Sequence, residues 1–294
     1  MRYIILILLI MTSCSRRSPK KKIAPTPPAY LLLDAYNTAL YGAKAAASPS
    51  NGWLEESECD AMLWAGKYAC GGGKPLLEYA EYVETPGKFN RRPEPHCGVA
   101  FGNSATTWSR DMGMGLLIGS WCNWDSTIMT RHMTYGKSKD WSMGEPYADG
   151  RAVYTPAIIG MFYQAIYRIS GADNSSRKWP SIYSEGLDDY QAHLQMIDIW
   201  IRSEIDDKPD LDVSTTQWER IKEHYRREPM CAFYSHMYGA HEGNLDDTIS
   251  ILLDPTPTAC TYLRGSEHVT TSEWLFVAKL TLEKMGIAPK LRVW

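Results

Sequence analysis

Apolar residues recur along this chain with the period of an α-helix, while the strict alternation typical of strands is scarce. Alanine is common and valine is sparse, which favours helices over strands. The clearest helical patterns cover 154–169, 185–205 and 272–285, and glycines flank the first and close the last. Weaker patterns cover 30–47, 58–70, 75–84, 108–121, 125–134, 215–227 and 245–253. The sequence therefore predicts a mainly α fold with long, aromatic-rich loops.

The first fourteen residues have the pattern of an export signal. Arg2 is followed by an apolar run over 3–11, which is too short to span a bilayer as a helix, since that takes roughly 20 residues. The run matches the h-region of a secretory signal, and the small residues Thr12 and Ser13 lead directly into Cys14. This segment resembles the bacterial lipoprotein signal. The resemblance implies cleavage after residue 13, a lipid on Cys14, and an anchored protein of the bacterial cell envelope, at the outer membrane or cell surface.

Two features depart from the usual lipoprotein pattern. Met11 stands where Leu, Val or Ile is usual, and a basic run follows the cysteine (Arg16, Arg17, Lys20, Lys21 and Lys22). Positive charge there resists translocation, although it can also hold a tether against anionic lipid headgroups. The alternatives are an uncleaved signal anchor, or an ordinary secretory signal in which Cys14 has no role.

The remaining chain divides into a tether and one domain. Residues 14–28 are basic and proline-rich with almost nothing apolar to bury, which is typical of an extended spacer. Residues 29–294 contain no second linker, and we expect a single helical domain. The net charge of −3 gives no basic footprint for nucleic acid once the tether is set aside, so the membrane is the partner we expect through Cys14.

The cysteines are consistent with export. Besides Cys14 the chain has an even set, which an oxidising compartment would allow to pair: Cys59, Cys70, Cys97, Cys122, Cys231 and Cys260. If 58–70 is one helix, Cys59 and Cys70 lie about 16 Å apart along its axis. A disulfide tolerates only about 7 Å between Cα atoms, so these two need other partners. The other pairings stay open, as does the possibility that all six are free.

Four stretches resemble a group of helical proteins built on the α/α toroid. They are Cys59–Gly66, Trp108–Leu117 (which resembles the group's S-R-D-M-x-x-G-x-L pattern), Asp149–Arg151 with the helix after Pro156, and Ser272–Phe276. The resemblance implies an α/α toroid-like helical barrel. A complete ring of six pairs needs twelve helices and the sequence shows about ten, which leaves an incomplete ring as an alternative to a complete one. Toroids host many glycoside hydrolases and polysaccharide lyases, which implies a carbohydrate-active site by analogy of fold alone.

Carboxylates at predicted helix starts are the candidate catalytic residues. Asp111, with Arg110 beside it, has the position of a general acid or base at a helix N-terminus, although the same residues also cap a helix and complement its dipole. Asp149 and Arg151 flank a turn glycine, with Tyr147 close by. Asp60 precedes another predicted helix and has the same two interpretations.

A second group of polar residues lies near the end of the chain. Tyr238, His241 and Glu242 fall in what the composition predicts to be a polar loop, and they are candidate substrate-binding residues. The HExxH zinc pattern is absent, so no metal is expected, and nothing in the sequence indicates a cofactor.

The aromatic composition favours a sugar ligand. There are 18 tyrosines and 11 tryptophans against 5 phenylalanines, and Tyr and Trp combine a flat apolar face with a polar group. Several surround the best motif, namely Trp108, Trp121, Trp124, Tyr135, Trp141 and Tyr147. The same residues would also suit helix packing or a protein interface.

Two mechanisms are compatible with a polysaccharide substrate. A hydrolase needs two carboxylates, for which Asp111 with Asp149 or Asp60 is the candidate pair. A lyase needs a Tyr or His base with Arg to neutralise a uronate, for which Tyr238, His241, Arg110 and Arg151 are candidates. The alternative from another class is a surface lipoprotein that binds a glycan or a protein without chemistry.

Overall fold

The computed structural model describes residues 27–54, 61–93, 107–146, 153–171, 189–206, 219, 231–253 and 271–287. This part of the chain is mainly helical, as predicted. The helices are α1 (Pro27–Ala46), α2 (Ala61–Cys70), α3 (Arg110–Cys122), α4 (Ser126–Ser138), α5 (Pro156–Ser170), α6 (Asp189–Ile205), α8 (Cys231–Glu242), α9 (Asp246–Leu253) and α10 (Thr271–Lys284). A short 3-10 helix, η1, covers Leu77–Ala80, and two-residue strands β1 (Thr107–Trp108) and β2 (Glu145–Pro146) form a parallel pair.

Two expectations about helices are wrong. The pattern over 75–84 predicted a helix, but only the single turn of η1 forms. The chain instead reverses at Pro86–Gly87, and Glu81 pairs with Phe89 as an antiparallel bridge. Proline followed by glycine is a turn signal, and it outweighs the apolar spacing of this segment.

The second error concerns Tyr238, His241 and Glu242, which were expected in a polar loop. They lie on α8, which ends at Gly243 with φ +78°. Ala232, Phe233 and Met237 are buried on one side of this helix, so packing against its neighbours stabilises a segment whose polar composition resembles a loop. The predicted helix at 215–227 lies outside the described residues apart from residue 219.

Helices α2 and α3 form the most tightly packed pair. All of α2 and most of α3 are buried around their whole circumference, as expected for helices in the centre of a core. Glycines make the approach possible: a Cβ on Gly115 would lie 2.5 Å from the Cα of Leu63. Cys70 and Cys122, the last residues of the two helices, form a disulfide, with their Cα atoms 5.1 Å apart. Cys70 therefore has a partner other than Cys59, as the helix geometry required.

Neighbouring helices in the centre run in the same direction. Met62 and Gly66 of α2 face Gly115 of α3, and the two C-termini meet at the disulfide. Lys67 of α2 pairs with Glu273 near the start of α10, and the carbonyl of Cys70 accepts a hydrogen bond from Lys279 further along α10. These ordered contacts give α10, α2 and α3 a common direction.

Helix α8 extends this row on the far side of α10. Phe233 of α8 contacts Phe276 of α10, and His236 contacts Thr281, so α8 has the same direction as α10.

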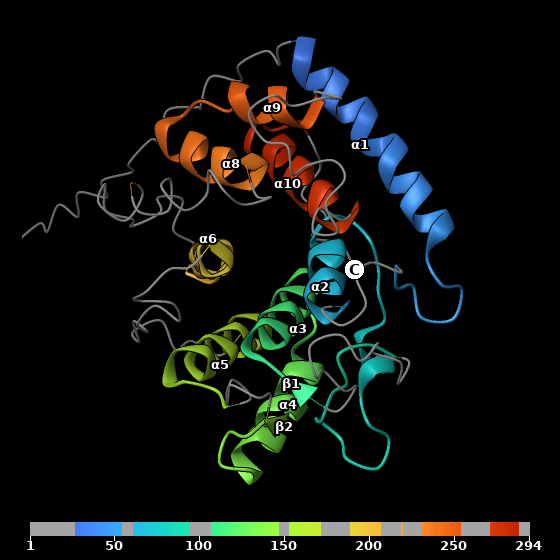
Figure 1. The fold of residues 1–294 in the computed structure, drawn as a ribbon, viewed down its shortest axis with the longest axis vertical. Coiled ribbons are helices and arrows are strands. Elements are labelled where there is room, and N and C mark those ends of the chain that lie inside the picture. The colour runs from blue at the N-terminus through green and yellow to red at the C-terminus, as the bar shows by residue number, and fades with distance from the viewer. Residues whose placement is uncertain are drawn as a thin grey trace, which may run out of the picture.

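The contacts between helices close into a cycle. α3 contacts α5, α5 contacts α6, and α6 contacts α8, which returns to α10 and α2. Figure 1 shows α6 between α5 and α8 on the opposite side from α2. α4 packs against α3 and α5, α9 against α8 and α10, and α1 against α9 and α10. Six of the described helices therefore follow one another in a cycle, with α1, α4 and α9 packed outside them.

Candidate functional site

The parallel pair of strands places residues 107–108, which lead into one predicted motif, beside residues 145–146. Thr107 lies opposite Glu145 and Trp108 opposite Pro146. The backbone that leads into Arg110 and Asp111 is therefore paired with the backbone that leads towards Tyr147 and Asp149. Residues about 40 positions apart in the sequence are adjacent here because of this pairing.

The N-terminus of α3 is polar, and its N-cap side chain makes no hydrogen bond to the backbone N–H groups of the first turn. Ser109 is the N-cap residue, but its hydroxyl makes no capping hydrogen bond. Its Oγ is buried and has no hydrogen-bond partner among the described residues. Arg110 and Asp111 follow in the first turn, and both are half-buried. Among the described residues no carboxylate pairs with Arg110. A half-buried guanidinium and a carboxylate next to the positive end of a helix dipole can bind and orient a polar ligand.

A second helix begins close to this point. Tyr154 precedes α5, and a Cβ on Gly113 in the first turn of α3 would lie 2.7 Å from the Cζ of Tyr154. Thr155, the N-cap residue of α5, also makes no side-chain capping bond, and its buried Oγ1 has no partner in the part of the chain that the structure describes. The N-termini of α3 and α5 therefore meet at one place, with both capping hydroxyls unbonded.

A buried series of hydrogen bonds lies close to the two N-termini and links Trp108, Tyr154, His132 and Gly87. The indole N–H of Trp108 donates to the hydroxyl oxygen of Tyr154 at 3.0 Å. His132 Nε2 lies 2.8 Å from the same hydroxyl, and its Nδ1 lies 2.8 Å from the carbonyl oxygen of Gly87. A carbonyl only accepts, so Nδ1 is protonated and donates to Gly87, while Nε2 accepts from Tyr154.

Burial keeps both ring groups neutral. It lowers the pKa of the His132 imidazole to about 4, against the opposing effects of the Gly87 carbonyl and the Glu81 carboxylate. Burial also raises the pKa of the Tyr154 phenol well above its ordinary value, against the smaller effect of the bond from Trp108. The chain of bonds is therefore a structural support at neutral pH, and it fixes the backbone that carries Arg110.

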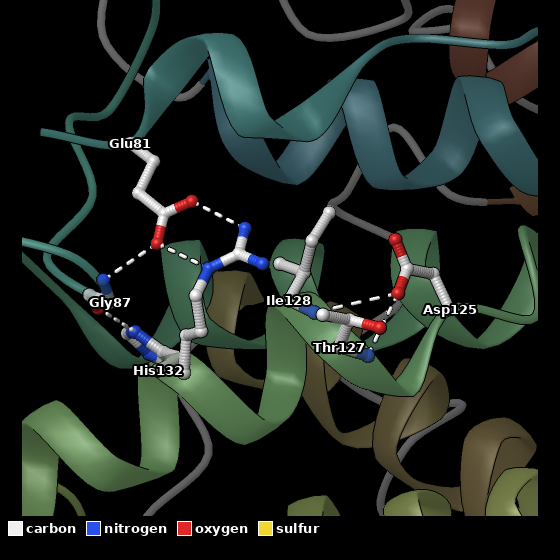
Figure 2. A network of polar contacts seen from close by, with 7 residues as sticks. Glu81, Gly87, Asp125, Thr127, Ile128 and His132 are labelled. Atoms are coloured by element: carbon white, nitrogen blue, oxygen red, sulfur yellow. Dashed lines mark hydrogen bonds and ion pairs between the residues drawn. The ribbon is translucent and has the colours of Figure 1, made fainter. Parts of the chain in front are cut away.

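The same chain continues to the surface through an ion pair. Figure 2 shows the carboxylate of Glu81 accepting from the backbone N–H of Gly87, whose carbonyl accepts from His132. Arg131 donates to both oxygens of Glu81, at 2.8 and 2.5 Å. Burial acts to raise the pKa of Glu81, but the bonds from Arg131 and Gly87 outweigh it and lower that pKa. Gly87 has φ +87°, a conformation that favours glycine.

The helix that carries His132 and Arg131 begins with a side-chain cap. Asp125 accepts from the backbone N–H of Thr127 at 2.8 Å and of Ile128 at 3.4 Å (Figure 2). This cap fixes the start of α4 two turns before His132.

Several predicted site residues lie outside the described part of the chain. These are Cys14, Asp60, Tyr147, Asp149 and Arg151. Asp60 immediately precedes α2, and Asp149 and Arg151 fall between β2 and α5.

Tyr238, His241 and Glu242 lie near the C-terminal end of α8, away from the α3 N-terminus. Because α8, α10, α2 and α3 run in the same direction, these residues and Arg110 are at opposite ends of the row of helices. Tyr238 stacks on Tyr234 with ring centroids 5.8 Å apart, and Nε2 of His241 lies 3.9 Å from Oε1 of Glu242. The described residues of the lyase set, Tyr238 and His241 with Arg110, are thus not brought together.

The aromatic residues around the motif divide between core and surface. Trp108 is fully buried, which corrects the expectation that it contacts a sugar. Trp121 is buried, and its ring packs at a tilt against that of Trp124, which is exposed. Tyr135 and Trp141 are half-buried. Trp53, Trp108 and Trp274 each donate their indole N–H inside the protein. Part of the tryptophan content therefore serves packing.

The described residues contain no group of three or more His, Cys, Asp and Glu side chains that could hold a metal ion. None of the helices in this part of the chain is long and apolar enough to cross a membrane. Comparison of the chain with known protein families, with curated proteins and with solved structures finds no match.

Sequence reasoning did not find the residues that support the site, namely Glu81, Arg131, His132 and Tyr154. Tyr154 was predicted only as the start of a helix. The detectable signal was His132 itself, a titratable residue between Met129 and Met133 on the apolar side of α4.

Proposed function

We propose that this protein is an exported lipoprotein, attached through Cys14 to a bacterial membrane, that binds a polysaccharide at the N-terminus of α3 and acts on it. The observation that carries the proposal is the meeting of two helix N-termini with unbonded capping hydroxyls beside Arg110 and Asp111. Sugar hydroxyls and carboxylates are suited to such donors and acceptors.

The arrangement of helices supports a toroid-like barrel. Two features are those of the inner ring of an α/α toroid. One is the closed cycle of α2, α3, α5, α6, α8 and α10, and the other is the common direction of α8, α10, α2 and α3. α1, α4 and α9 have the positions of outer helices, while η1 stands between α2 and α3 where a full ring would have another. We propose an incomplete ring, whose inner N-termini gather at one end.

Within this site Asp111 is the proposed acid or base, and Arg110 orients the substrate. The proposed second carboxylate is Asp149 or Asp60, each of which is close in sequence to the start of an inner helix. Hydrolysis needs both acids, one protonated and one ionised. The binding-only alternative needs neither.

The test uses the purified domain, residues 29–294, on an array of bacterial and plant polysaccharides. We expect product release by the parent and its loss in Asp111→Asn and Asp149→Asn, with Asp246→Asn, an exposed acid at the start of α9, as the matched control. Retention of a glycan without product, equal in all four proteins, would leave a binding protein. No retention and no product would overturn the polysaccharide proposal.

The lipid anchor is tested separately. In bacteria labelled with radioactive palmitate, the parent should take up label and sediment with membranes, and Cys14→Ser should do neither. Equal labelling of both proteins would refute the assignment of Cys14.

A further inference from the structure

Exposed apolar side chains gather along one side of the molecule. On α1 they are Tyr30, Leu31 and Tyr41, the last of which is 79% exposed. On the segment 74–83 they are Leu76, Tyr79 and Val83, the last of which is 89% exposed. These six are most of the large apolar residues that are exposed in the described part of the chain; the others are Trp124, Val153 and Tyr238.

The two segments are joined by packing. The turn after α1 lies against the second segment, because Leu76 donates its backbone N–H to the carbonyl of Asn51 and Trp53 donates its indole N–H to the carbonyl of Leu76. Figure 1 shows α1 and the segment around η1 along the same edge of the molecule. We call this surface, α1 with 74–83, the α1 flank.

The opposite side of α1 accounts for its attachment to the core. Leu32, Tyr36 and Ala43 are buried, and the Tyr36 hydroxyl donates to the carbonyl of Gly71. The outward tyrosines are not needed for that packing. Tyrosine is enriched where a protein meets the headgroup region of a bilayer, because its ring is apolar and its hydroxyl remains hydrated.

The position of α1 in the chain indicates what covers this flank. α1 begins thirteen residues after Cys14, and a chain of that length reaches at most about 45 Å when fully extended. The intervening residues include five cations at 16–22, which are attracted to anionic lipid headgroups. The net charge of the flank is small: Asp34, Glu78 and Glu81 stand against Lys44 and Lys74, and Glu81 is paired with Arg131.

We propose that the α1 flank rests on the lipid surface to which Cys14 tethers the chain, so that the domain is held at the bilayer by its own apolar residues as well as by the anchor. The occupant is a lipid surface that carries anionic headgroups. The proposal rests on the proposed function only in its choice of membrane, and its test does not depend on acylation.

The experiment measures binding of the mature chain from residue 14, with Cys14→Ser, to vesicles. Vesicles of phosphatidylcholine with phosphatidylglycerol are compared with vesicles of phosphatidylcholine alone. We expect binding to the anionic vesicles, weakened about tenfold or more in Leu31→Ser/Tyr41→Ser/Val83→Ser and unchanged in Val153→Ser. Val153 is exposed but lies outside the flank, and the four positions are on the surface, so circular dichroism should show equal folding.

Equal binding of the triple variant and the parent would overturn the proposal, because the basic tether would then account for all of it. An absence of binding in every protein would overturn it too. So would a dimer of the parent that the triple variant loses in gel filtration, since the flank would then bind a second copy. Vesicle binding combined with failed palmitate labelling would reject the anchor and leave the flank assignment standing.

Discussion

The residues that support the candidate site form one connected series of hydrogen bonds, which is buried at Tyr154 and His132 and partly exposed at Glu81 and Arg131. Tyr154 has the central position, since its hydroxyl accepts from Trp108 and donates to His132. Buried polar groups contribute little net stability when paired but are costly when a partner is removed. Because of this asymmetry, removal of the Tyr154 hydroxyl alone should destabilise the segment that carries Arg110.

We expect Tyr154→Phe to lower the free energy of unfolding by about 1–3 kcal/mol, because Trp108 and His132 each lose a partner in the core. Urea denaturation measures the change. The same substitution at Tyr41, which is exposed, should have almost no effect. Equal, small effects at the two positions would show that the Tyr154 hydroxyl is not bonded as described.

Two buried histidines give a prediction for pH. Burial lowers the pKa of His132 to about 4, and burial with the charge of Lys284 lowers that of His236 to about 3, from an ordinary value of 6.5. Below pH 6.5 the two imidazoles are therefore protonated in the unfolded chain but stay neutral in the folded chain until the pH is much lower. The free energy of unfolding should fall as the pH is lowered through this window, by up to about 1.4 kcal/mol per pH unit for each histidine.

Thermal unfolding from pH 7.5 to 4.5 tests this, with His236→Asn as the comparison. The variant should lose about half of the parent's slope even if it is less stable at every pH. Parallel curves would exclude His236 as a contributor. Glu81 adds a separate loss at lower pH, because its lowered pKa means that the folded chain protonates it only under more acidic conditions.

Among the helices, the contact between α2 and α3 depends on the absence of side chains. Gly66 and Gly115 allow the two backbones to touch, and a Cβ on Gly66 would lie 2.8 Å from the carbonyl carbon of Gly115. The disulfide between Cys70 and Cys122 holds the other end of the same pair. Close packing along the whole length sets the position of the α3 N-terminus relative to the core.

Gly115→Ala should destabilise the protein by about 1–3 kcal/mol, since backbone must move to admit the methyl group. Gly42→Ala is the matched control, because a Cβ at Gly42 in α1 meets nothing within 4 Å. There the better helix propensity of alanine should stabilise the protein by up to about 1 kcal/mol. Effects of the same sign at both positions, measured by urea denaturation, would contradict the packing.

At the level of the whole molecule, an ion pair joins two helices that are far apart in the sequence. Lys67 and Glu273 are 206 positions apart, both are buried, and Lys67 also lies 4.2 Å from the ring centroid of Trp64. The pair connects α2 to α10, which are neighbours in the cycle of helices. A buried pair of this kind is costly to break but not necessarily costly to replace.

Lys67→Met should therefore cost about 3–5 kcal/mol, because the carboxylate of Glu273 keeps its burial and loses its cation. Lys67→Met/Glu273→Leu should recover much of that loss. Equilibrium unfolding of the parent, both single variants and the double variant completes the cycle. A double variant as unstable as the sum of the single ones would refute a direct pair.

The sequence by itself determined the class of fold and the approximate bounds of most helices, because apolar spacing is a local property that packing preserves. α1, α3, α5 and α10 lie within a few residues of their predicted positions. The same local reasoning failed at η1, where a turn outweighed periodicity, and at α8, where burial of Phe233 and Met237 outweighed a polar composition. That Cys70 pairs with a cysteine other than Cys59 agrees with the expectation from helix geometry.

Only the tertiary structure decided which distant residues meet. Three kinds of contact join segments that are far apart in the sequence. They are the disulfide between Cys70 and Cys122, the pairing of β1 with β2, and the hydrogen bonds that run from Glu81 through Gly87 and His132 to Tyr154 and Trp108. Such contacts depend on the register and direction of whole helices, which no local pattern contains. For the same reason the sequence did not show that Trp108, which belongs to the best motif, is a core residue. It supports the site through its hydrogen bond to Tyr154.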